Sequence, residues 1–269
     1  MTRLTTSDIH NLGSEIANYN SDLIKKTGSD MRTLVCFASG ISAERFAEAS
    51  RDYAVAVVPI TSGQGLIGSF AESVQSIIEF LGYTSFVTEH TDVAGIAEAV
   101  ERKAHLIFMA DDDRFIVFNV GQGFYVDNAQ ATARGYVAAL AHMARGLSGE
   151  DVLVLGAGPV GQGAISFLKE LGAQVKVFDI KQEKLARYQN DSQVFTELSL
   201  AEALRKYKYI LDATPATDFI GLNDLHPEAV VAAPGIPLGL TAEAFARNKD
   251  RIVHDPLQLG VATMLAMAL

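Results

Sequence analysis

A glycine-rich turn is the strongest chemical signal in the sequence. It lies between an apolar strand candidate at 151–156 and a helix candidate at about 159–171. In dinucleotide-binding folds the first glycine of such a turn permits tight bending, the second lets a pyrophosphate approach the backbone, and the third lets helix and strand pack closely. The helix N-terminus also offers unpaired N–H groups and a positive dipole end to phosphates. The turn consists of Gly156, Ala157, Gly158, Pro159, Val160 and Gly161.

A carboxylate after the next strand candidate supports a dinucleotide site. Asp179 follows the strand candidate QVKVF, 18 residues after Gly161. A carboxylate at this spacing accepts hydrogen bonds from both ribose hydroxyls of an adenosine, and its charge repels a 2′-phosphate. We therefore predict NAD rather than NADP as the cofactor, although Lys181 and Lys184 lie close by. FAD is a weaker competitor, and a turn that serves only a tight strand-to-helix connection is the structural alternative.

Two later loops are predicted to complete the cofactor site. Thr214 and Pro215 follow the strand candidate YILD, and Pro234 and Gly235 follow VVA. Ligands in open α/β sheets bind outside the carboxyl ends of the strands, so these loops can form a rim against ribose and nicotinamide. Ordinary turns have the same composition, and both interpretations stay open.

Polar residues in the first half are candidates for substrate binding. Ser62 follows a buried strand candidate and can hold an anionic group or cap the next helix. Asp111 opens an acidic run after the strand candidate HLIFMA. Such runs are usually solvated, but this first carboxylate is expected to point inward, where it can anchor an amine or act as a base. Asn128 either joins the same cleft or caps a helix. No cluster of metal-ligand type accompanies these residues, so no metal is predicted.

Alternating strand and helix signals must position these residues. From 149 to 269 the alternation is regular and includes a helix expected near 181–188. It predicts a Rossmann domain with a doubly wound parallel sheet and a C-terminal helix. Residues 1–148 mix both signals after an N-terminal helical segment from Leu4 to about Lys26, and are predicted to form an α/β substrate-binding domain. The fold class is therefore α/β, with the active site expected in the cleft between the two domains.

Composition narrows the functional classes. The 269 residues are 49% hydrophobic, and 22 basic against 32 acidic side chains give a net charge of −10. This charge disfavours nucleic acid as a partner. The lone Cys36 can form neither an internal disulfide nor a thiolate metal site, and no signal peptide or membrane span is visible. We expect a cytoplasmic protein with a small-molecule partner and no membrane contact, and leave a homodimer open.

Seven segments, in order along the chain, carry a family resemblance. They are Pro59–Gly68 (PITSGQGLIG), Ser85–Thr88, Met109–Asp112 (MADD), Val154–Gly161, Ala213–Pro215, Pro234–Pro237 and a C-terminal segment with Pro256, Leu257, Gly260 and Ala262–Leu265. With them the chain resembles the PylD family, the pyrrolysine synthases that act as dehydrogenases in pyrrolysine biosynthesis. The Rossmann segments are generic, whereas PITSGQGLIG and MADD are specific to the family.

The resemblance implies a reaction and a set of site residues. The reaction is NAD-dependent oxidation of the terminal amine of N6-[(3R)-3-methyl-D-ornithyl]-L-lysine, followed by cyclisation with ammonia release to L-pyrrolysine. Asp111 is the expected catalytic carboxylate. The family carries a glutamate where this chain has Asp255, a shorter carboxylate. The implied substrate pocket is lined by Leu4, Ser62, Asp111, Asn128 and Asp255.

Two other functions stay open at the level of sequence. Another NAD(P)-dependent amino-acid or methylene-carrier dehydrogenase would carry the same glycine turn and loops. A non-catalytic dinucleotide-sensing protein would keep the nucleotide site without turnover.

Overall fold

The computed structural model describes Ile9 and residues 12–269, which form two compact units. Unit 1 contains the described residues up to Asp22 together with Asp30–Thr132 and Pro256–Leu269. Unit 2 contains Leu23–Ser29 and Ala133–Asp255. None of the helices within the described range has both the length and the apolar character needed to cross a bilayer.

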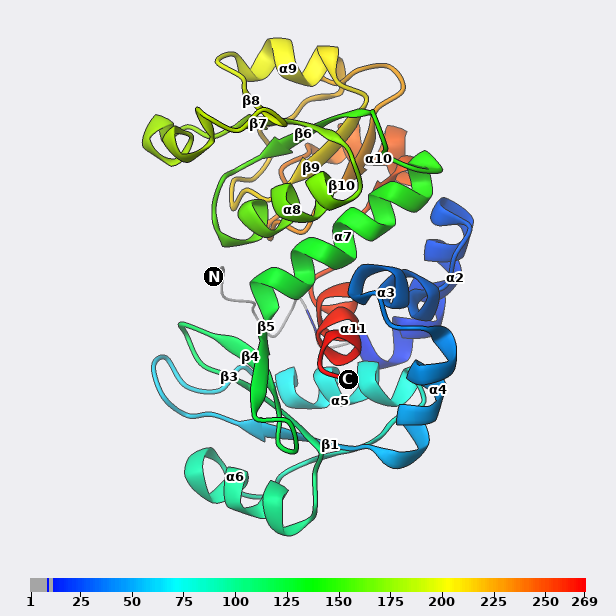
Figure 1. Cartoon of the computed structure of the whole chain (residues 1–269), viewed down its shortest axis with the longest axis vertical. Coiled ribbons are helices and arrows are strands. Elements are labelled where there is room, and N and C mark those ends of the chain that lie inside the picture. The colour runs from blue at the N-terminus through cyan, green and yellow to red at the C-terminus, as the bar shows by residue number, and fades with distance from the viewer. Residues whose placement is uncertain (1–8, 10–11) are drawn as a thin grey trace. The chain divides into compact units, whose positions relative to one another are not determined.

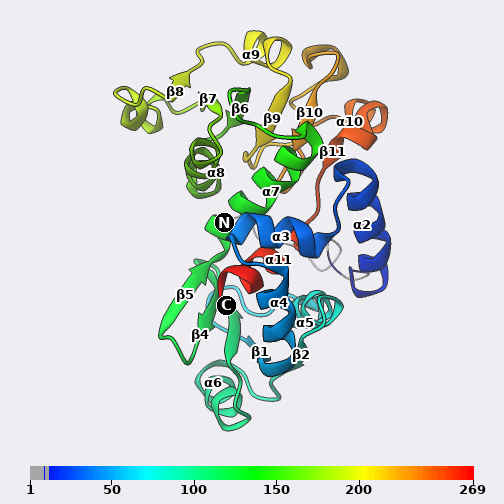
Figure 2. The same ribbon diagram turned by 45° about the vertical axis from the view of Figure 1, so that its right-hand side comes forward.

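The sheet of unit 1 is mixed. Its order is β2-β1-β3-β4-β5, with β1 parallel to β2 and β3, and with β4 antiparallel to β3 and β5. Helix α6 covers one face, and α5 and α11 cover the other (Figure 2). This cover on both faces explains the continuous apolar run of β1. The elements are β1 (Ala54–Pro59), β2 (Thr84–Val87), β3 (Leu106–Ala110), β4 (Phe115–Asn119), β5 (Phe124–Asp127), α5 (Phe70–Phe80), α6 (Asp92–Glu101) and α11 (Gln258–Met267).

The N-terminal part of the chain contains more helix than expected. After α2 (Leu12–Thr27), two further helices follow, α3 (Met31–Ser39) and α4 (Ala43–Asp52). Asp30 caps α3 by accepting the Thr33 N–H, and Ser42 caps α4 by accepting the Arg45 N–H. Gly40, with φ of 76°, ends α3. The sequence contains these capping and terminating residues. The helices that they flank are only 9 and 10 residues long, so the sequence analysis did not identify them.

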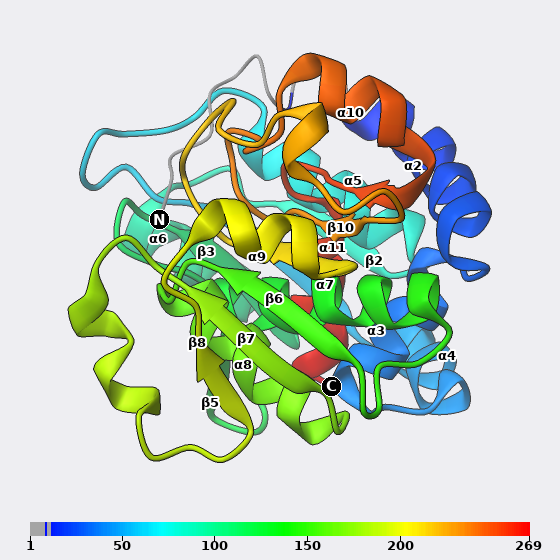
Figure 3. The ribbon, with the colours of Figure 1, turned by 90° about the horizontal axis from the view of Figure 1, so that it is seen from above.

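Unit 2 contains the predicted doubly wound sheet. All six strands are parallel, in the order β11-β10-β9-β6-β7-β8, which is the Rossmann order read from one edge. Helices α8 and α9 lie on opposite faces (Figure 1), and β6, β7 and β8 run side by side in Figure 3. The elements are β6 (Asp151–Leu155), β7 (Gln174–Phe178), β8 (Val194–Thr196), β9 (Tyr209–Asp212), β10 (Val230–Ala232), β11 (Ile252–Val253), α8 (Pro159–Glu170), α9 (Leu200–Lys206), α10 (Ala242–Asn248) and the part of α7 (Asn128–Ala144) from Ala133 onward.

One predicted helix of unit 2 is replaced by short turns. Residues 181–188 form two 3-10 turns, η1 (Gln182–Lys184) and η2 (Ala186–Tyr188), instead of an α-helix. Leu185 is the only buried residue of this segment, so it lacks the apolar stripe that would hold a helix on the sheet.

The units divide the chain differently from the expected boundary at residue 148. Helix α7 contributes residues to both units, and α11 belongs to unit 1 rather than to the Rossmann unit. Figures 1 and 2 show α11 in red beside the blue α3 and the cyan α5, with which it packs. Nine of its residues are buried. A helix that is apolar on all sides needs cover on all sides, and the helices of unit 1 supply it.

Candidate functional site

The glycine turn of unit 2 has the geometry that a dinucleotide site requires. Gly156 has φ of 89°, and a Cβ there would lie 3.0 Å from the Ala213 carbonyl oxygen. A Cβ on Gly161 would lie 1.9 Å from the Gly156 carbonyl oxygen, so only glycine lets α8 start so close to β6. A Cβ on Gly158 would meet nothing within 4 Å. The backbone is therefore open at Gly158, directly before Pro159 at the N-terminus of α8.

Asp179 connects this turn to the segment after β7. Its Oδ2 accepts the Ala157 N–H at 2.8 Å, and its Oδ1 accepts the Lys181 N–H at 2.8 Å. The Lys184 ammonium is 3.4 Å from Oδ2. Burial alone would raise the pKa of Asp179, but the two amides and Lys184 together hold this pKa below its usual value. Asp179 is therefore an ionised, buried carboxylate at the carboxyl end of β7.

The two predicted loops of unit 2 lie against each other. A Cβ on Gly235 would lie 2.1 Å from the Thr214 carbonyl oxygen. The Gly235 N–H donates to the Asp212 carbonyl oxygen at 3.2 Å. The loops that carry Pro215 and Pro234 thus meet at the carboxyl ends of β9 and β10, where ligands of parallel sheets bind.

Asp212, which sequence reasoning missed, lies under these loops. It is fully buried, and its Oδ1 accepts the Thr214 N–H at 3.1 Å and the Thr214 hydroxyl at 2.7 Å. Burial raises the pKa of this carboxyl group to about 6, although the Thr214 and Gly239 groups act in the opposite direction. Its position at the end of the apolar strand YILD was the available signal.

In unit 1 the structure brings the loop after β1 to the acidic turn between β3 and β4. The Gln64 N–H donates to Asp112 Oδ2 at 2.7 Å, and a Cβ on Gly63 would lie 2.1 Å from that oxygen. The Thr61 N–H and hydroxyl donate to Asp92 at 2.8 and 2.6 Å. Ser62 lies exposed in this loop. Two carboxylates therefore fix the loop on both sides of Ser62.

Asp111 is exposed, and the expectation that it points inward is wrong. Its Oδ1 accepts the Asp113 N–H at 2.8 Å and the Arg114 N–H at 2.7 Å, which closes the β3–β4 turn. Short turns favour this local bonding of an aspartate to its own backbone. Asp112, not Asp111, contacts the loop after β1. The second carboxylate oxygen of Asp111 lies outside these turn hydrogen bonds.

Asn128 is the first residue of α7 and belongs to unit 1. Its Oδ1 accepts the Thr132 hydroxyl at 3.1 Å. Asp127 rather than Asn128 accepts the N–H of Ala129, so Asn128 is not the cap.

Asp255, in unit 2, is buried against Tyr136. The Tyr136 hydroxyl is 2.8 Å from Asp255 Oδ2 and accepts the Asp255 N–H at 2.9 Å. Leu4, the remaining predicted substrate residue, lies outside the described residues.

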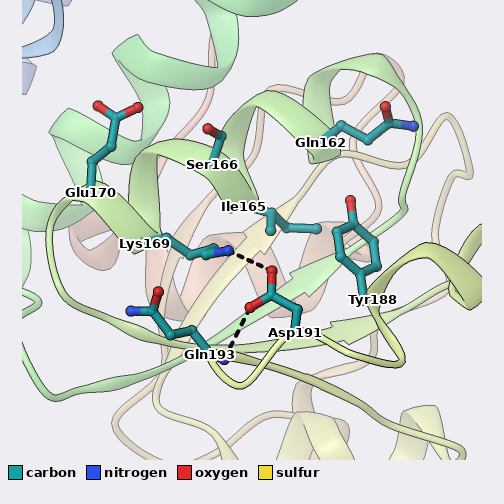
Figure 4. Close-up of a pocket in the computed structure, with 8 residues that line it drawn as sticks. All are labelled: Gln162, Ile165, Ser166, Lys169, Glu170, Tyr188, Asp191 and Gln193. Carbon is teal, nitrogen blue, oxygen red and sulfur yellow. Dashed lines mark hydrogen bonds and ion pairs between the residues drawn. The ribbon is translucent and has the colours of Figure 1, made fainter.

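A separate polar pocket lies on the flank of α8 (Figure 4). Its two central charges, Lys169 and Asp191, point toward each other and form an ion pair. Within the described chain, no three His, Cys, Asp or Glu side chains gather as a metal ion would need. None of the predicted site residues lines this pocket, whose walls are Gln162, Ile165, Ser166, Lys169, Glu170, Tyr188, Asp191 and Gln193.

The parallel sheet of unit 2 and its glycine turn define a Rossmann fold, as the sequence predicted. Residues 126–220 match the C-terminal domain of the alanine dehydrogenase/PNT family. Shikimate dehydrogenase from Aquifex aeolicus has a TM-score of 0.54 at 15% identity and covers 79% of this chain and 90% of its own. Quinate dehydrogenase from Corynebacterium glutamicum, solved with NAD, has a TM-score of 0.52 at 13% identity, with coverage of 81% and 94%. At these identities the similarity shows the fold alone.

The sequence relatives define the family. Residues 8–126 match the N-terminal domain of the pyrrolysine biosynthesis protein PylD. The pyrrolysine synthase of Methanosarcina acetivorans is 31% identical over 265 residues, which are 98% of both chains. The pyrrolysine synthase of Methanosarcina barkeri is also 31% identical, over 98% of this chain and 97% of its own. The chain belongs to the PylD family of pyrrolysine biosynthesis, and the predicted resemblance is confirmed.

Proposed function

We propose that the protein catalyses the last step of pyrrolysine biosynthesis. The substrate is N6-[(3R)-3-methyl-D-ornithyl]-L-lysine, whose terminal amine is oxidised before ring closure to L-pyrrolysine. The observation that carries the proposal is the similarity to two pyrrolysine synthases along 98% of this chain. The chain is expected to act in the cytoplasm on this small molecule alone, as its single cysteine and net charge of −10 suggest.

The residues of unit 2 fit NAD. The open backbone at Gly158 and the N-terminus of α8 suit a pyrophosphate, and Thr214, Pro215, Pro234 and Gly235 suit the ribose and nicotinamide. Asp179 keeps lone pairs for ribose hydroxyls beyond those that its backbone donors use. Its ionised state favours NAD over NADP, because a 2′-phosphate would meet a fixed negative charge. When bound, NAD supplies the hydride acceptor.

The substrate must lose one hydride and one proton before the ring closes. The hydride leaves the carbon that bears the terminal amine, and the nitrogen loses a proton, so that an imine forms. The α-amine of the methylornithyl part attacks this carbon, and the terminal nitrogen leaves as ammonia. We assign the proton to Asp111, directly or through one water, because its second carboxylate oxygen lies outside the turn hydrogen bonds.

Other polar residues are proposed to orient the substrate. Ser62 is held in its loop by neighbouring hydrogen bonds to Asp92 and Asp112, which suits a residue that must present a hydroxyl at a fixed position. Asn128 supplies an amide that can both donate and accept. Asp255 supplies a second carboxylate for an ammonium group, and Tyr136 fixes its orientation. Leu4 is proposed to add an apolar contact.

The experiment is to incubate the protein with NAD and the methylornithyl-lysine isopeptide, following NADH absorbance and product mass. We expect one NADH and one ammonia for each pyrrolysine. NADH formation with other amino acids but not with the isopeptide would indicate a different amino-acid or methylene-carrier dehydrogenase. NAD binding without turnover of any substrate would indicate a dinucleotide sensor.

A further inference from the structure

Asp212 occupies a central position in the Rossmann sheet. It ends β9, and its register partner on β6 is Leu155, the residue before Gly156. The Ala213 N–H donates to the Leu155 carbonyl oxygen at 2.9 Å. Asp212 therefore lies beside the start of the glycine turn, on the strand next to the one that leads into it.

The residue also joins the two loops that are proposed to surround the nicotinamide. Its Oδ1 accepts both donors of Thr214, and its main-chain oxygen accepts the Gly235 N–H. Its Oδ2 lies against the backbone of Gly239, where an added Cβ would come within 2.2 Å. Asp212 thus forms hydrogen bonds with both loops, with Thr214 in the loop after β9 and with Gly235 in the loop after β10.

The Oδ2 atom lacks a partner. It is the one buried side-chain nitrogen or oxygen of the described residues that forms no hydrogen bond. The Gly239 backbone favours the charged form but does not complete a hydrogen bond to Oδ2. Among the residues that the structure describes, no charged side chain shifts the pKa of this carboxyl group, since only Thr214 and Gly239 oppose the effect of its burial. Above pH 6 it is a buried anion that the two Thr214 donors on Oδ1 compensate in part, and Oδ2 has no hydrogen bond, so a nearby cation would stabilise it further.

We propose that Asp212 is a specificity-determining residue for the redox state of the cofactor, because its buried carboxylate attracts the cationic nicotinamide ring of NAD+ and so favours NAD+ over NADH. This inference rests on the proposed binding of NAD to unit 2. NAD+ and NADH share the ADP-ribose part and differ in the charge of the nicotinamide ring. A fixed anion beneath the loops that meet this ring therefore changes the ratio of the two affinities. Such a bias helps an amine oxidation, which must bind NAD+ and release NADH.

The test measures dissociation constants of NAD+, NADH and ADP-ribose at pH 8 for the full chain and for Asp212→Asn. We expect the variant to lose about tenfold of the preference for NAD+, which corresponds to about 1.4 kcal/mol of lost charge interaction. ADP-ribose affinity reports whether the site is still formed. The matched control is Asp250→Asn, which removes the same charge from an exposed position of unit 2 and should leave the ratio unchanged.

The pH dependence of the unsubstituted protein tests the same idea without a substitution. Between pH 8 and pH 5 the carboxyl group takes up a proton, so the preference for NAD+ should fall toward that of Asp212→Asn. Two results would overturn this inference without affecting the proposed function. One is an unchanged ratio of NAD+ to NADH affinity in Asp212→Asn, with ADP-ribose binding retained. The other is a ratio that does not change with pH in the unsubstituted protein. Failure of the unsubstituted protein to bind any of the three ligands would contradict the proposed function as well.

Discussion

At the residue scale, Asp179 serves the fold and the proposed ligand together. Its carboxylate accepts one backbone N–H from the glycine turn and another from the segment after β7, so it fixes both sides of the proposed nucleotide site. The sequence predicted this residue because the spacing of turn, helix, strand and acid is set by local geometry. The exposure of Asp111 was not predictable, because it depends on which backbone amides of the β3–β4 turn its carboxylate meets.

Substitution of Asp179 tests the ribose assignment. Asp179→Ala should weaken NAD binding at least tenfold, because it removes charge-assisted hydrogen bonds worth about 1.5–3 kcal/mol each. It should also reduce the discrimination against NADP. Titration of both cofactors measures these effects, with far-UV circular dichroism as the check on folding. Unchanged NAD affinity, or unchanged discrimination, would show that the assignment is wrong.

Substitution of Asp111 tests the proposed proton transfer. Asp111→Asn keeps an oxygen for the two turn amides, so the β3–β4 turn should persist. Turnover at saturating NAD should fall by about 10²–10⁴, the usual contribution of a general base. Asp113→Asn is the control, since Asp113 is an exposed neighbour in the same turn. Full turnover by Asp111→Asn would exclude it as base and as amine anchor.

At the element scale, the short loops between strands and helices carry the candidate chemistry. The strands β1, β3, β6, β7 and β9 were predictable from apolar runs, whereas the pairing of the loop after β1 with the β3–β4 turn was not. That pairing depends on Asp112, which reaches the Gln64 N–H across 48 positions of sequence. The prediction of a helix at 181–188 was wrong. The sequence of this segment is compatible with a helix, but it does not show that Leu185 alone becomes buried in the fold.

The loop after β1 provides a steric test with a matched control. Gly63 and Gly65 both have positive φ, 73° and 81°, but a Cβ would meet Asp112 Oδ2 at 2.1 Å only at Gly63. Gly63→Ala and Gly65→Ala should therefore share a conformational cost of about 1–2 kcal/mol. Gly63→Ala alone should raise the KM for the isopeptide, by about tenfold, with NAD affinity unchanged. Steady-state kinetics of both variants measure this, and equal KM values would contradict a positioning role for the Asp112 contact.

At the scale of the whole molecule, the path of the chain was the least predictable feature. The sequence placed 149–269 in one Rossmann domain, but α11 returns to unit 1 after β11. Gly260 of α11 packs closely against Thr132 of α7, since a Cβ on Gly260 would lie 2.7 Å from the Thr132 hydroxyl. An apolar helix indicates that it will be covered, but not by which unit, because that choice depends on contacts distant in sequence.

The burial of Asp212 should make the free energy of unfolding depend on pH. Its pKa of about 6 in the folded state exceeds the ordinary value of 3.8, so its stabilising contribution is complete below pH 3.8 and is lost as the pH rises through 6. The loss amounts to about 2–3 kcal/mol, from roughly 1.4 kcal/mol per pKa unit. Asp179 acts in the opposite direction, because its pKa is lowered on folding. The difference between the unsubstituted protein and Asp212→Asn isolates the contribution of Asp212. Urea unfolding should show the two nearly equal near pH 4 and the variant more stable at pH 8, whereas parallel profiles would mean that Asp212 is not a buried anion at pH 8.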